Sequence, residues 1–525
     1  MSQQSVMNAE AISGPAAAPS TAGRREWIGL AVIALPCLLY SMDLTVLNLA
    51  LPSLSADLRP SSTQLLWIVD IYGFMVAGLL ITMGTVGDRI GRRRLLMIGA
   101  GAFGVASVLA AFARSAEMLI VLRALLGVAG ATLAPSTLSL IRNMFHDPQQ
   151  RTVAIGIWVS SYSVGAAVGP LVGGLLLEFF WWGSVFLIGV PVMVLLLVLG
   201  PWLLPESRDP NAGRLDLWSV ALSLAAILSM IFGLKRAAEG GWSWMAASAI
   251  AAGALAGLAF VRRQVRLDDP LIDLRLFRHR AFSAALGSYT LGCFVLFGAF
   301  LFIAQYLQLV LDLTPLQAGL WTVPWALAFV VGSMLTPALV GRFVPAKVVT
   351  GGLVLAALGF AVLAQPFIAL NLALILIATI TMSLGLAAVF TLATDLVVSA
   401  APPERAGAAS ALSETSSEFG GAMGIAVLGT IGAAVYRSQM TGTATGELPP
   451  AAMEAARGSL GGALAVSEQL PGPLAEGLAM LSRAAFVDGM QVVSLIATVL
   501  MVLTAFLFMM AVRTGGRVPP SASGT

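Results

Sequence analysis

Residues 41–52 read Ser-Met-Asp-Leu-Thr-Val-Leu-Asn-Leu-Ala-Leu-Pro. They close an apolar segment that begins near Trp27, which is long enough to cross a membrane as a helix. One carboxylate, that of Asp43, lies inside this segment. A charged side chain at the centre of a membrane helix costs about 2.5–3.5 kcal/mol on insertion scales, so Asp43 must face a partner or a cavity. The stretch therefore predicts a membrane helix that carries an ion or substrate site.

The composition extends this prediction to the whole chain. Of 525 residues, 58% are hydrophobic and only 10% are charged, with a mean hydropathy of +0.91 and 54 glycines. These values exclude a soluble globular protein and favour an all-α polytopic membrane protein. The net charge of +3 comes without a basic stretch that would bind nucleic acid. Cys37 and Cys293 lie far apart in apolar segments, which indicates neither a disulfide framework nor a metal site.

Fourteen apolar segments are long enough to span a bilayer. Their approximate ranges are 27–52, 64–86, 95–114, 117–140, 152–177, 183–204, 217–234, 243–262, 282–306, 316–340, 347–365, 370–399, 407–436 and 486–512.

The basic residues predict the orientation of these segments. If the N-terminus is cytoplasmic, the inner connections hold 21 arginines and lysines and the outer connections hold 7, with Arg123 inside a helix. Such a bias toward the cytoplasmic side sets membrane topology. We therefore expect a multi-pass membrane protein with both termini cytoplasmic. Residues 1–26 and 513–525 read as cytoplasmic tails, the first without a cleavage site.

Two polar stretches interrupt the apolar pattern. Residues 263–281, around Asp268 and Asp269, are expected to form a cytoplasmic link, and residues 437–485 a long outer loop. We interpret both as solvated connectors, although the outer loop could also cover an exit path.

A third polar feature is a short turn on the expected cytoplasmic side, between the second and third apolar segments. Residues 84–94 read Gly-Thr-Val-Gly-Asp-Arg-Ile-Gly-Arg-Arg-Arg. Gly84 and Gly91 permit a tight turn, and Asp88 can cap the next helix. The arginines, Arg89 and Arg92 among them, can bridge neighbouring helix ends. A simple positive anchor at the membrane surface would explain the arginines but not the spacing of the glycines and the aspartate.

Four acids in apolar segments are the candidate proton and cation sites: Asp43, Asp70, Glu414 and Glu418. Glu414 and Glu418 are four residues apart, so they share one helix face and should titrate as a coupled pair. Asp70 could instead lie at the outer headgroups, and Glu414 could face the cytoplasm. Asp395 and Asp312, near helix ends, are expected to be solvated.

A buried arginine and a glycine repeat complete the candidate machinery. Arg123 lies about two turns inside its helix, where it either snorkels to the outer surface or takes part in proton handling. Gly165, Gly169 and Gly173 recur every four residues and would let another helix approach closely, and Pro170 interrupts the hydrogen-bond ladder there. Simple helix packing explains this repeat equally well.

Together these motifs resemble the major facilitator superfamily. Residues 84–94 look like its signature cytoplasmic loop, and Asp43-Leu44-Thr45 with residues 46–52 is similar to the first-helix signature of its fourteen-helix drug:proton antiporters. Arg123 with Gly127 and Gly130 resembles the fourth-helix motif of that group, and residues 165–174 resemble its fifth-helix antiporter motif. The likeness covers the chain from Trp27 to Arg513 and is nearest to exporters of quaternary ammonium compounds and dyes.

This resemblance implies two six-helix bundles, residues 27–205 and 282–512, with two inserted helices in residues 206–281. It also implies a binding site near the middle of the membrane between the bundles. Protons from outside would compete there with a lipophilic cation for Asp43, Asp70, Glu414 and Glu418, with Arg123 in support. Aromatic residues could stack on such a cation, although packing explains most of them as well; they are Trp67, Trp158, Tyr162, Phe302 and Tyr306.

We expect no cofactor and no metal, because the proton gradient would supply the energy, and a monomer in the lipid bilayer would suffice. Two other classes of function stay open. A transporter of one metabolite, lipid or siderophore would use the acids for coupling alone. A receptor or scaffold would have to accept the cost of four acids in the membrane. A membrane enzyme lacks support, because His146 and His279 are isolated and no nucleophile or phosphate-binding constellation occurs in the sequence.

Overall fold

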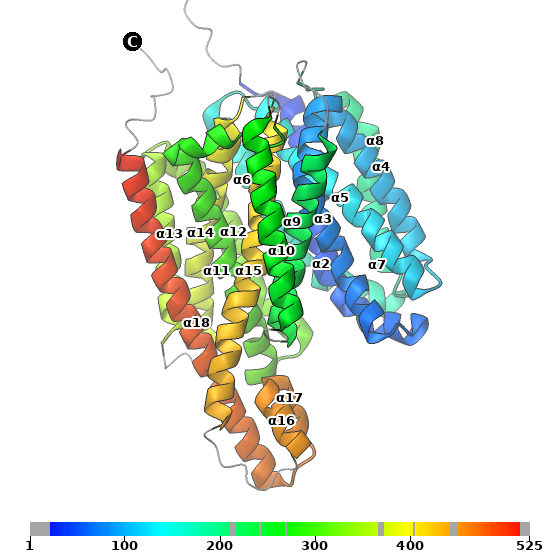
Figure 1. Ribbon diagram of the computed structural model, residues 1–525, viewed down its shortest axis with the longest axis vertical. Coiled ribbons are helices and arrows are strands. Elements are labelled where there is room, and N and C mark those ends of the chain that lie inside the picture. Colours follow the sequence, from blue (N-terminus) through cyan, green and yellow to red (C-terminus); the bar gives the residue numbers. More distant parts are fainter. Residues whose placement is uncertain are drawn as a thin grey trace, which may run out of the picture.

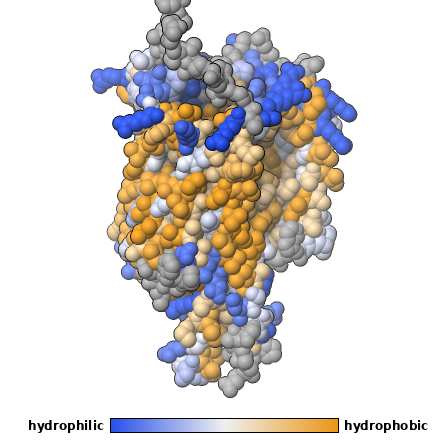
Figure 2. All heavy atoms as spheres, turned by 90° about the vertical axis from the view of Figure 1, so that its left-hand side faces the viewer, coloured by the Kyte–Doolittle hydropathy of each residue, from blue (hydrophilic) through white to orange (hydrophobic). Residues whose placement is uncertain are grey.

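The computed structural model describes residues 21–209, 216–240, 243–267, 270–365, 372–402, 405–441 and 450–514. Within these ranges fourteen helices are long and apolar enough to cross a membrane, as the sequence predicts, and no strand occurs among them. Most of the two predicted tails and the pair Asp268–Asp269 lie outside the described residues. Figure 2 shows a broad apolar belt around the molecule with hydrophilic side chains beyond its edges.

The first group of helices comprises residues 24–203. A single proline divides its last member: Pro191 has no N–H to donate to the carbonyl of Leu187, and the helix is interrupted at Ile188. The members are α2 (Arg24–Leu58), α3 (Ser62–Ile90), α4 (Arg92–Ala111), α5 (Ala116–Met144), α6 (Pro148–Phe179), α7 (Ser184–Leu187) and α8 (Gly189–Leu203).

The second group of helices follows residue 279. Its first member ends in a π-helical turn, η2 (Tyr306–Val310). The spanning members are α11 (Arg280–Gln305), α12 (Pro315–Val340), α13 (Pro345–Leu363), α14 (Leu372–Ala400), α15 (Ala406–Thr441) and α18 (Gly472–Thr514). In Figure 1 the two groups stand side by side as two bundles, which we call the N-bundle and the C-bundle.

Two inserted helices, α9 (Leu217–Gly240) and α10 (Trp244–Arg266), lie in front of the junction between the bundles in Figure 1. Helix α9 packs on α10 and also on α3 and α15, one helix from each bundle. Asp216, just before α9, accepts hydrogen bonds of 2.6 and 2.9 Å from Arg263 of α10. The guanidinium of Arg263 holds the pKa of Asp216 well below its usual range. A short 3-10 helix, η1 (Leu274–Arg278), leads on to the C-bundle.

Helix α2 begins and α18 ends at the same end of the molecule, the upper end in Figure 1. We call this end the inner end, because the arginine distribution predicts that it is cytoplasmic. The opposite end is the outer end. Since α2 already starts at Arg24, the helix takes up the last residues of the predicted N-terminal tail.

In the described residues 437–441 and 450–485, the expected solvated outer loop is mostly helical and partly buried. Helix α15 continues to Thr441 and α18 begins at Gly472, and in Figure 1 both helices project beyond the outer ends of the other spanning helices. Between them lie two short helices, α16 (Pro450–Gly458) and α17 (Leu460–Ser467), which bury Leu460 against the projecting parts. The Tyr436 hydroxyl donates a 2.8 Å hydrogen bond to the carbonyl of Ala456. The alanine- and leucine-rich sequence buries an apolar face in this extension instead of forming a loop.

Candidate functional site

The carboxylate of Asp43 is paired with Arg123 inside the N-bundle. Nη1 of Arg123 donates to Oδ2 of Asp43 at 2.6 Å, and Nε donates to the carbonyl of Ile68 at 3.1 Å. Arg123 is only 1% exposed and its guanidinium carbon lies 4.8 Å from the ring centre of Tyr72. The alternative in which Arg123 snorkels to the outer surface is therefore wrong. The cost of burying Asp43 is offset by a buried cation, with a hydrogen bond and an aromatic face around it.

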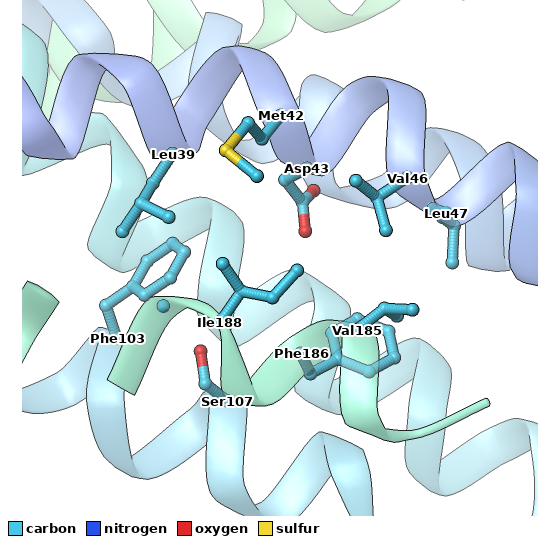
Figure 3. A pocket seen from close by; sticks show the side chains of 11 residues that line it. Leu39, Met42, Asp43, Val46, Leu47, Phe103, Ser107, Val185, Phe186 and Ile188 are labelled. Carbon is cyan, nitrogen blue, oxygen red and sulfur yellow. The ribbon is translucent and has the colours of Figure 1, made fainter. Parts of the chain in front are cut away.

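A small cavity lies on the other side of Asp43. It has a volume of about 20 Å³ and separates α2 from α4 and the broken helix α7–α8. Figure 3 shows the Asp43 carboxylate directed toward Ile188 and Val185 across this cavity, with Ser107 nearby. A space of this size admits about one water molecule, so the otherwise apolar wall leaves room for a proton carrier beside Asp43.

The two acids of α15 lie where the bundles meet. Glu418 accepts a hydrogen bond from the Tyr40 hydroxyl of α2, which joins the C-bundle to the N-bundle. Glu414 is buried, and its Oε1 has no hydrogen-bond partner among the described residues. The hydroxyl of Tyr162, also buried without a partner there, belongs to α6 of the other bundle. The charges of Glu414 and Glu418 act on each other, as the four-residue spacing predicts. Glu414 does not face the cytoplasm, so that alternative is wrong.

Aromatic rings connect these acids to the buried ion pair. The ring centre of Tyr40 lies 5.9 Å from that of Tyr72 and 5.9 Å from that of Tyr162. Tyr162 in turn packs edge to face on Trp158 at 5.0 Å. Because Tyr72 covers Arg123, an unbroken series of polar and aromatic side chains runs from Asp43 to the acids of α15. A change in the charge of Asp43 can therefore influence the interface between the bundles.

Asp70 has a separate partner. It pairs with Lys235 of the inserted helix α9, and the Lys235 ammonium lies 5.1 Å from the ring centre of Phe74. The sequence placed Lys235 in an outer connection, but α9 continues through Gly240 and carries it into the helix. The carboxylate lies near the outer ends of α3 and α9 and is 18% exposed, so the alternative of Asp70 at the outer headgroups stays open. The structure thus separates Asp43 from Asp70 by giving each its own cation.

Residues 84–94 join the two bundles at the inner end. The predicted turn is shorter than expected: α3 continues through Ile90 and α4 begins at Arg92, so Gly84 lies in a helix and only Gly91 forms the turn. Asp88 was expected to cap the helix that follows it, but α4 has no side-chain cap. Instead, the two carboxylate oxygens of Asp88 accept hydrogen bonds from the backbone N–H groups of Gly407 and Ala408, at 3.1 and 3.0 Å, and cap α15. Arg92 Nε also donates to Asp88 at 2.8 Å. A negative charge at a helix N-terminus is stabilising, so this arrangement holds α15 against α3.

Gly84 and Gly91 each have a structural role in this segment. A Cβ on Gly84 would lie 2.6 Å from the carbonyl oxygen of Gly407, which leaves no room for a side chain between α3 and α15. Gly91 has a φ of 110°, in the left-handed region that favours glycine. As expected of the arginines, Arg93 bridges helix ends by donating to the carbonyls of Pro201 and Leu204. Arg89 lines a cavity of about 190 Å³ beside the turn.

Two further polar contacts close the inner end. Arg151 of α6 donates to Asp395 of α14 at 2.8 Å, and Arg142 donates to the carbonyl of Ala401 at 2.7 Å. The expectation that Asp395 is solvated is wrong, because its side chain is only 15% exposed and also accepts from Thr152. Asp312, by contrast, is exposed at the outer end and pairs with Arg483. In this conformation the inner ends of the two bundles are thus held together.

The glycine repeat of α6 allows the close approach that its spacing predicts. A Cβ on Gly165 would lie 2.2 Å from the carbonyl oxygen of Leu38 in α2, and one on Gly173 would lie 2.8 Å from Val46. Gly169 is buried between them. The side chain of Pro170 lies outside the described residues. The repeat therefore fixes α6 against the segment of α2 that carries Tyr40 and Asp43.

The five aromatic candidates fall into different environments. Trp158 is 1% exposed and donates to Thr137 at 3.0 Å, so it supports Tyr162 from behind. Trp67 is 41% exposed and packs on Phe74. Phe302 and Tyr306 are buried within the C-bundle, Phe302 against Phe486. In this conformation Tyr162 and Trp67 lie beside the acids, whereas Phe302 and Tyr306 pack the bundle.

Three residues of the site were not predicted from the sequence: Tyr40, Tyr72 and Lys235. The chain has only six tyrosines. Tyr40 precedes Asp43 by three residues, about one helical turn, and Tyr72 follows Asp70 by two. The rarity of tyrosine in these apolar segments could have indicated the two tyrosines, because a buried phenol hydroxyl usually forms a hydrogen bond with a polar group. For Lys235 a single residue at the end of an apolar segment offered no comparable sign.

Comparisons with known proteins agree with this arrangement. The family model described as "Major Facilitator Superfamily" matches residues 33–425. The multidrug efflux pump LfrA of Mycolicibacterium smegmatis is 46% identical over 489 residues, which cover 93% of this chain and 97% of LfrA. The methyl viologen resistance protein SmvA of Salmonella typhimurium is 35% identical over 475 residues, covering 88% of this chain and 93% of SmvA.

Among solved structures, the fold is similar to that of the human organic anion transporter MFSD10. The TM-score is 0.61 at 15% identity, and the match covers 92% of this chain and 99% of the other. At this identity the likeness concerns the fold alone. The proteins that are similar in sequence are efflux and resistance proteins. With fourteen helices of spanning length among its described residues, this chain is a multi-pass membrane transporter of the efflux type, not an enzyme. The chain belongs to the major facilitator superfamily.

Proposed function

We propose that this transporter exports lipophilic cations in exchange for protons across the bacterial cytoplasmic membrane, with both termini in the cytoplasm. The observation that carries the proposal is Glu414, a buried carboxyl group at the interface between the bundles whose Oε1 has no partner among the described residues. In a low-dielectric interior such a group is stable when it is protonated or when a cation lies against it. The two occupants exclude each other, and this exclusion is the requirement for exchange.

The surroundings of Glu414 suit an organic cation. Tyr40 and Tyr162 present aromatic rings next to the two acids of α15, and aromatic faces attract quaternary ammonium groups. The relatives support the same class of substrate, since LfrA is named a multidrug efflux pump and SmvA a methyl viologen resistance protein. Methyl viologen is an aromatic cation. Glu418 and Asp43 would then carry protons, and the tyrosines between them would couple the two positions.

The energy of the proton gradient is sufficient for this work. Each proton that enters supplies about 2.3 kcal/mol per 100 mV of membrane potential and about 1.4 kcal/mol per pH unit. Because the exported cation moves against the same potential, exchange of one proton for one monovalent cation is driven by the pH difference alone and sustains a gradient of about tenfold per pH unit. A second proton adds both contributions in full. We propose that the transporter works as a monomer and without a cofactor.

Purified protein in liposomes tests the proposal. A pH-sensitive dye inside the vesicles reports proton movement when ethidium or tetraphenylphosphonium is added. We expect protons to move against the cation, and Asp43→Asn, Glu414→Gln and Glu418→Gln each to abolish this movement. Glu476→Gln, an exposed acid in the outer extension, is the matched control and should behave as the unmodified protein.

If neither ethidium nor tetraphenylphosphonium moves protons, antiport of lipophilic cations is refuted. Saturable transport of a single metabolite or lipid in the same vesicles would favour the narrower function. Full activity in all three acid variants would remove these carboxylates as carriers.

A further inference from the structure

Helices α3 and α9 run antiparallel, and three successive contacts fix their register. A Cβ on Gly78 would lie 3.0 Å from Leu228, which shows how closely the helices approach. One turn closer to the outer end, Phe74 packs with Ile231 in a small buried cluster. One further turn brings Asp70 to Lys235. The ion pair thus occupies a position set by the apolar packing of the same helical interface on its inner side.

The group around Asp70 has the composition of a site for an organic cation. The carboxylate is 18% exposed, and the Phe74 ring one turn along α3 lies 5.1 Å from the Lys235 ammonium. The Trp67 ring, on the same face of α3, packs edge to face on Phe74 at 6.3 Å. A carboxylate and aromatic faces around one cation are the elements that bind quaternary ammonium groups. Here the cation in place belongs to the protein itself.

We propose that Lys235 acts as an intramolecular cation that occupies Asp70 in the absence of substrate, and that an exported lipophilic cation displaces it. This inference rests on the proposed function and assigns Lys235 as a specificity-determining residue within it. In the exchange no covalent bond forms or breaks: the Asp70–Lys235 ion pair opens and a contact between Asp70 and the substrate cation replaces it.

The released ammonium is not left without a counter-charge. The charge of Lys235 also acts on Glu418 of α15, so both acids lie within its electrostatic reach. Since α9 packs on α3 and α15, displacement of Lys235 changes the attraction between the inserted helix and both bundles. The inserted pair thereby senses whether the Asp70 position holds a substrate.

An internal competitor lowers the apparent affinity for substrate by the fraction of time for which the site is open. The Lys235 side chain is 38% exposed, and ion pairs of such exposure are weak. An occupancy of about 80% by Lys235 corresponds to an apparent affinity about fivefold below that of the open site.

The first test measures the KM for tetraphenylphosphonium export in liposomes. Lys235→Gln should lower KM about fivefold, because the competitor is removed. Lys235→Arg keeps the cation and should leave KM unchanged. Lys347→Gln is the matched control, since Lys347 is the only other lysine of the chain and lies exposed at the inner end of α13. If the pair serves only to anchor α9, Lys235→Gln lowers stability without lowering KM, and this result would overturn the inference.

The second test uses the unmodified protein and does not depend on the folding of a variant. Formaldehyde with a borane reductant methylates neutral amines, so an ion-paired Lys235 is protected and a released Lys235 reacts. Mass spectrometry reports the methylation of Lys235, with Lys347 as internal reference. Saturating tetraphenylphosphonium should raise the methylation rate of Lys235 severalfold, and Asp70→Asn should raise it without any ligand.

An unchanged rate at saturating tetraphenylphosphonium would refute the displacement. The outcomes separate the two proposals. If the unmodified protein exchanges no cation for protons, the proposed function fails. If it does so while Lys235→Gln and the methylation rate show no effect, only the role of Lys235 fails.

Discussion

Asp88→Asn is expected to release the inner ends of the bundles from each other. The carboxylate accepts from two backbone N–H groups of α15 and from Arg92, and it lies at the N-terminus of that helix. The amide retains the size of the side chain but loses the negative charge, and its NH₂ group cannot accept. Hydrogen bonds to charged groups contribute about 1.5–3 kcal/mol, so the ratio of inner-open to inner-closed molecules should rise about 10- to 150-fold.

Distances between spin labels at the two inner ends measure this ratio. Cysteines at Arg94, exposed on α4, and Lys347, exposed on α13, report on one bundle each. The native Cys37 and Cys293 are buried and remain unlabelled under mild conditions. Glu206→Gln is the matched control, because Glu206 is an inner-end acid that contacts Arg93 within the N-bundle. Distance distributions that are identical for Asp88→Asn and for the control would refute the assignment of Asp88 as one of the contacts that close the inner end.

Three further changes test the packing and the charges of the fold. Gly165→Ala places a Cβ 2.2 Å from a backbone carbonyl of α2 and should destabilise the protein by about 1–3 kcal/mol in thermal unfolding, whereas Gly174→Ala, with open space around it, should be neutral. Arg151→Ala leaves the carboxylate of Asp395 without its cation and should lower the unfolding temperature more than the double change Arg151→Ala with Asp395→Ala; equal losses would contradict the pairing. The pKa of Asp216 is lowered in the folded protein, so its pairing stabilises above the ordinary carboxyl pKa and is lost as the pH falls below it. Asp216→Asn should therefore weaken the loss of stability between about pH 5 and pH 3, and an unchanged acid limb would contradict this.

The positions of the spanning helices could be predicted because each depends on a local property. A run of about twenty apolar residues must form a helix in hydrocarbon, whatever lies beside it. The close approach of another helix at Gly165 and Gly173 could be predicted for the same reason, since a four-residue spacing places small residues on one helix face. The packing of the outer extension was not predicted: within the described residues 450–467, α16 and α17 form while Leu460 and its neighbours are buried, which depends on partners from α15 and α18.

By itself, the sequence singled out five candidate charges in its apolar segments, Asp43, Asp70, Arg123, Glu414 and Glu418, from their cost in hydrocarbon, but not Lys235. It could not determine which charge meets which. The tertiary structure decided that Asp43 pairs with Arg123, 80 residues away, and that Glu418 meets Tyr40 across the two bundles. It also brought Lys235 from an inserted helix to Asp70. Pairing depends on the register and neighbours of separate helices, and these follow from packing over the whole bundle, which no single apolar segment encodes.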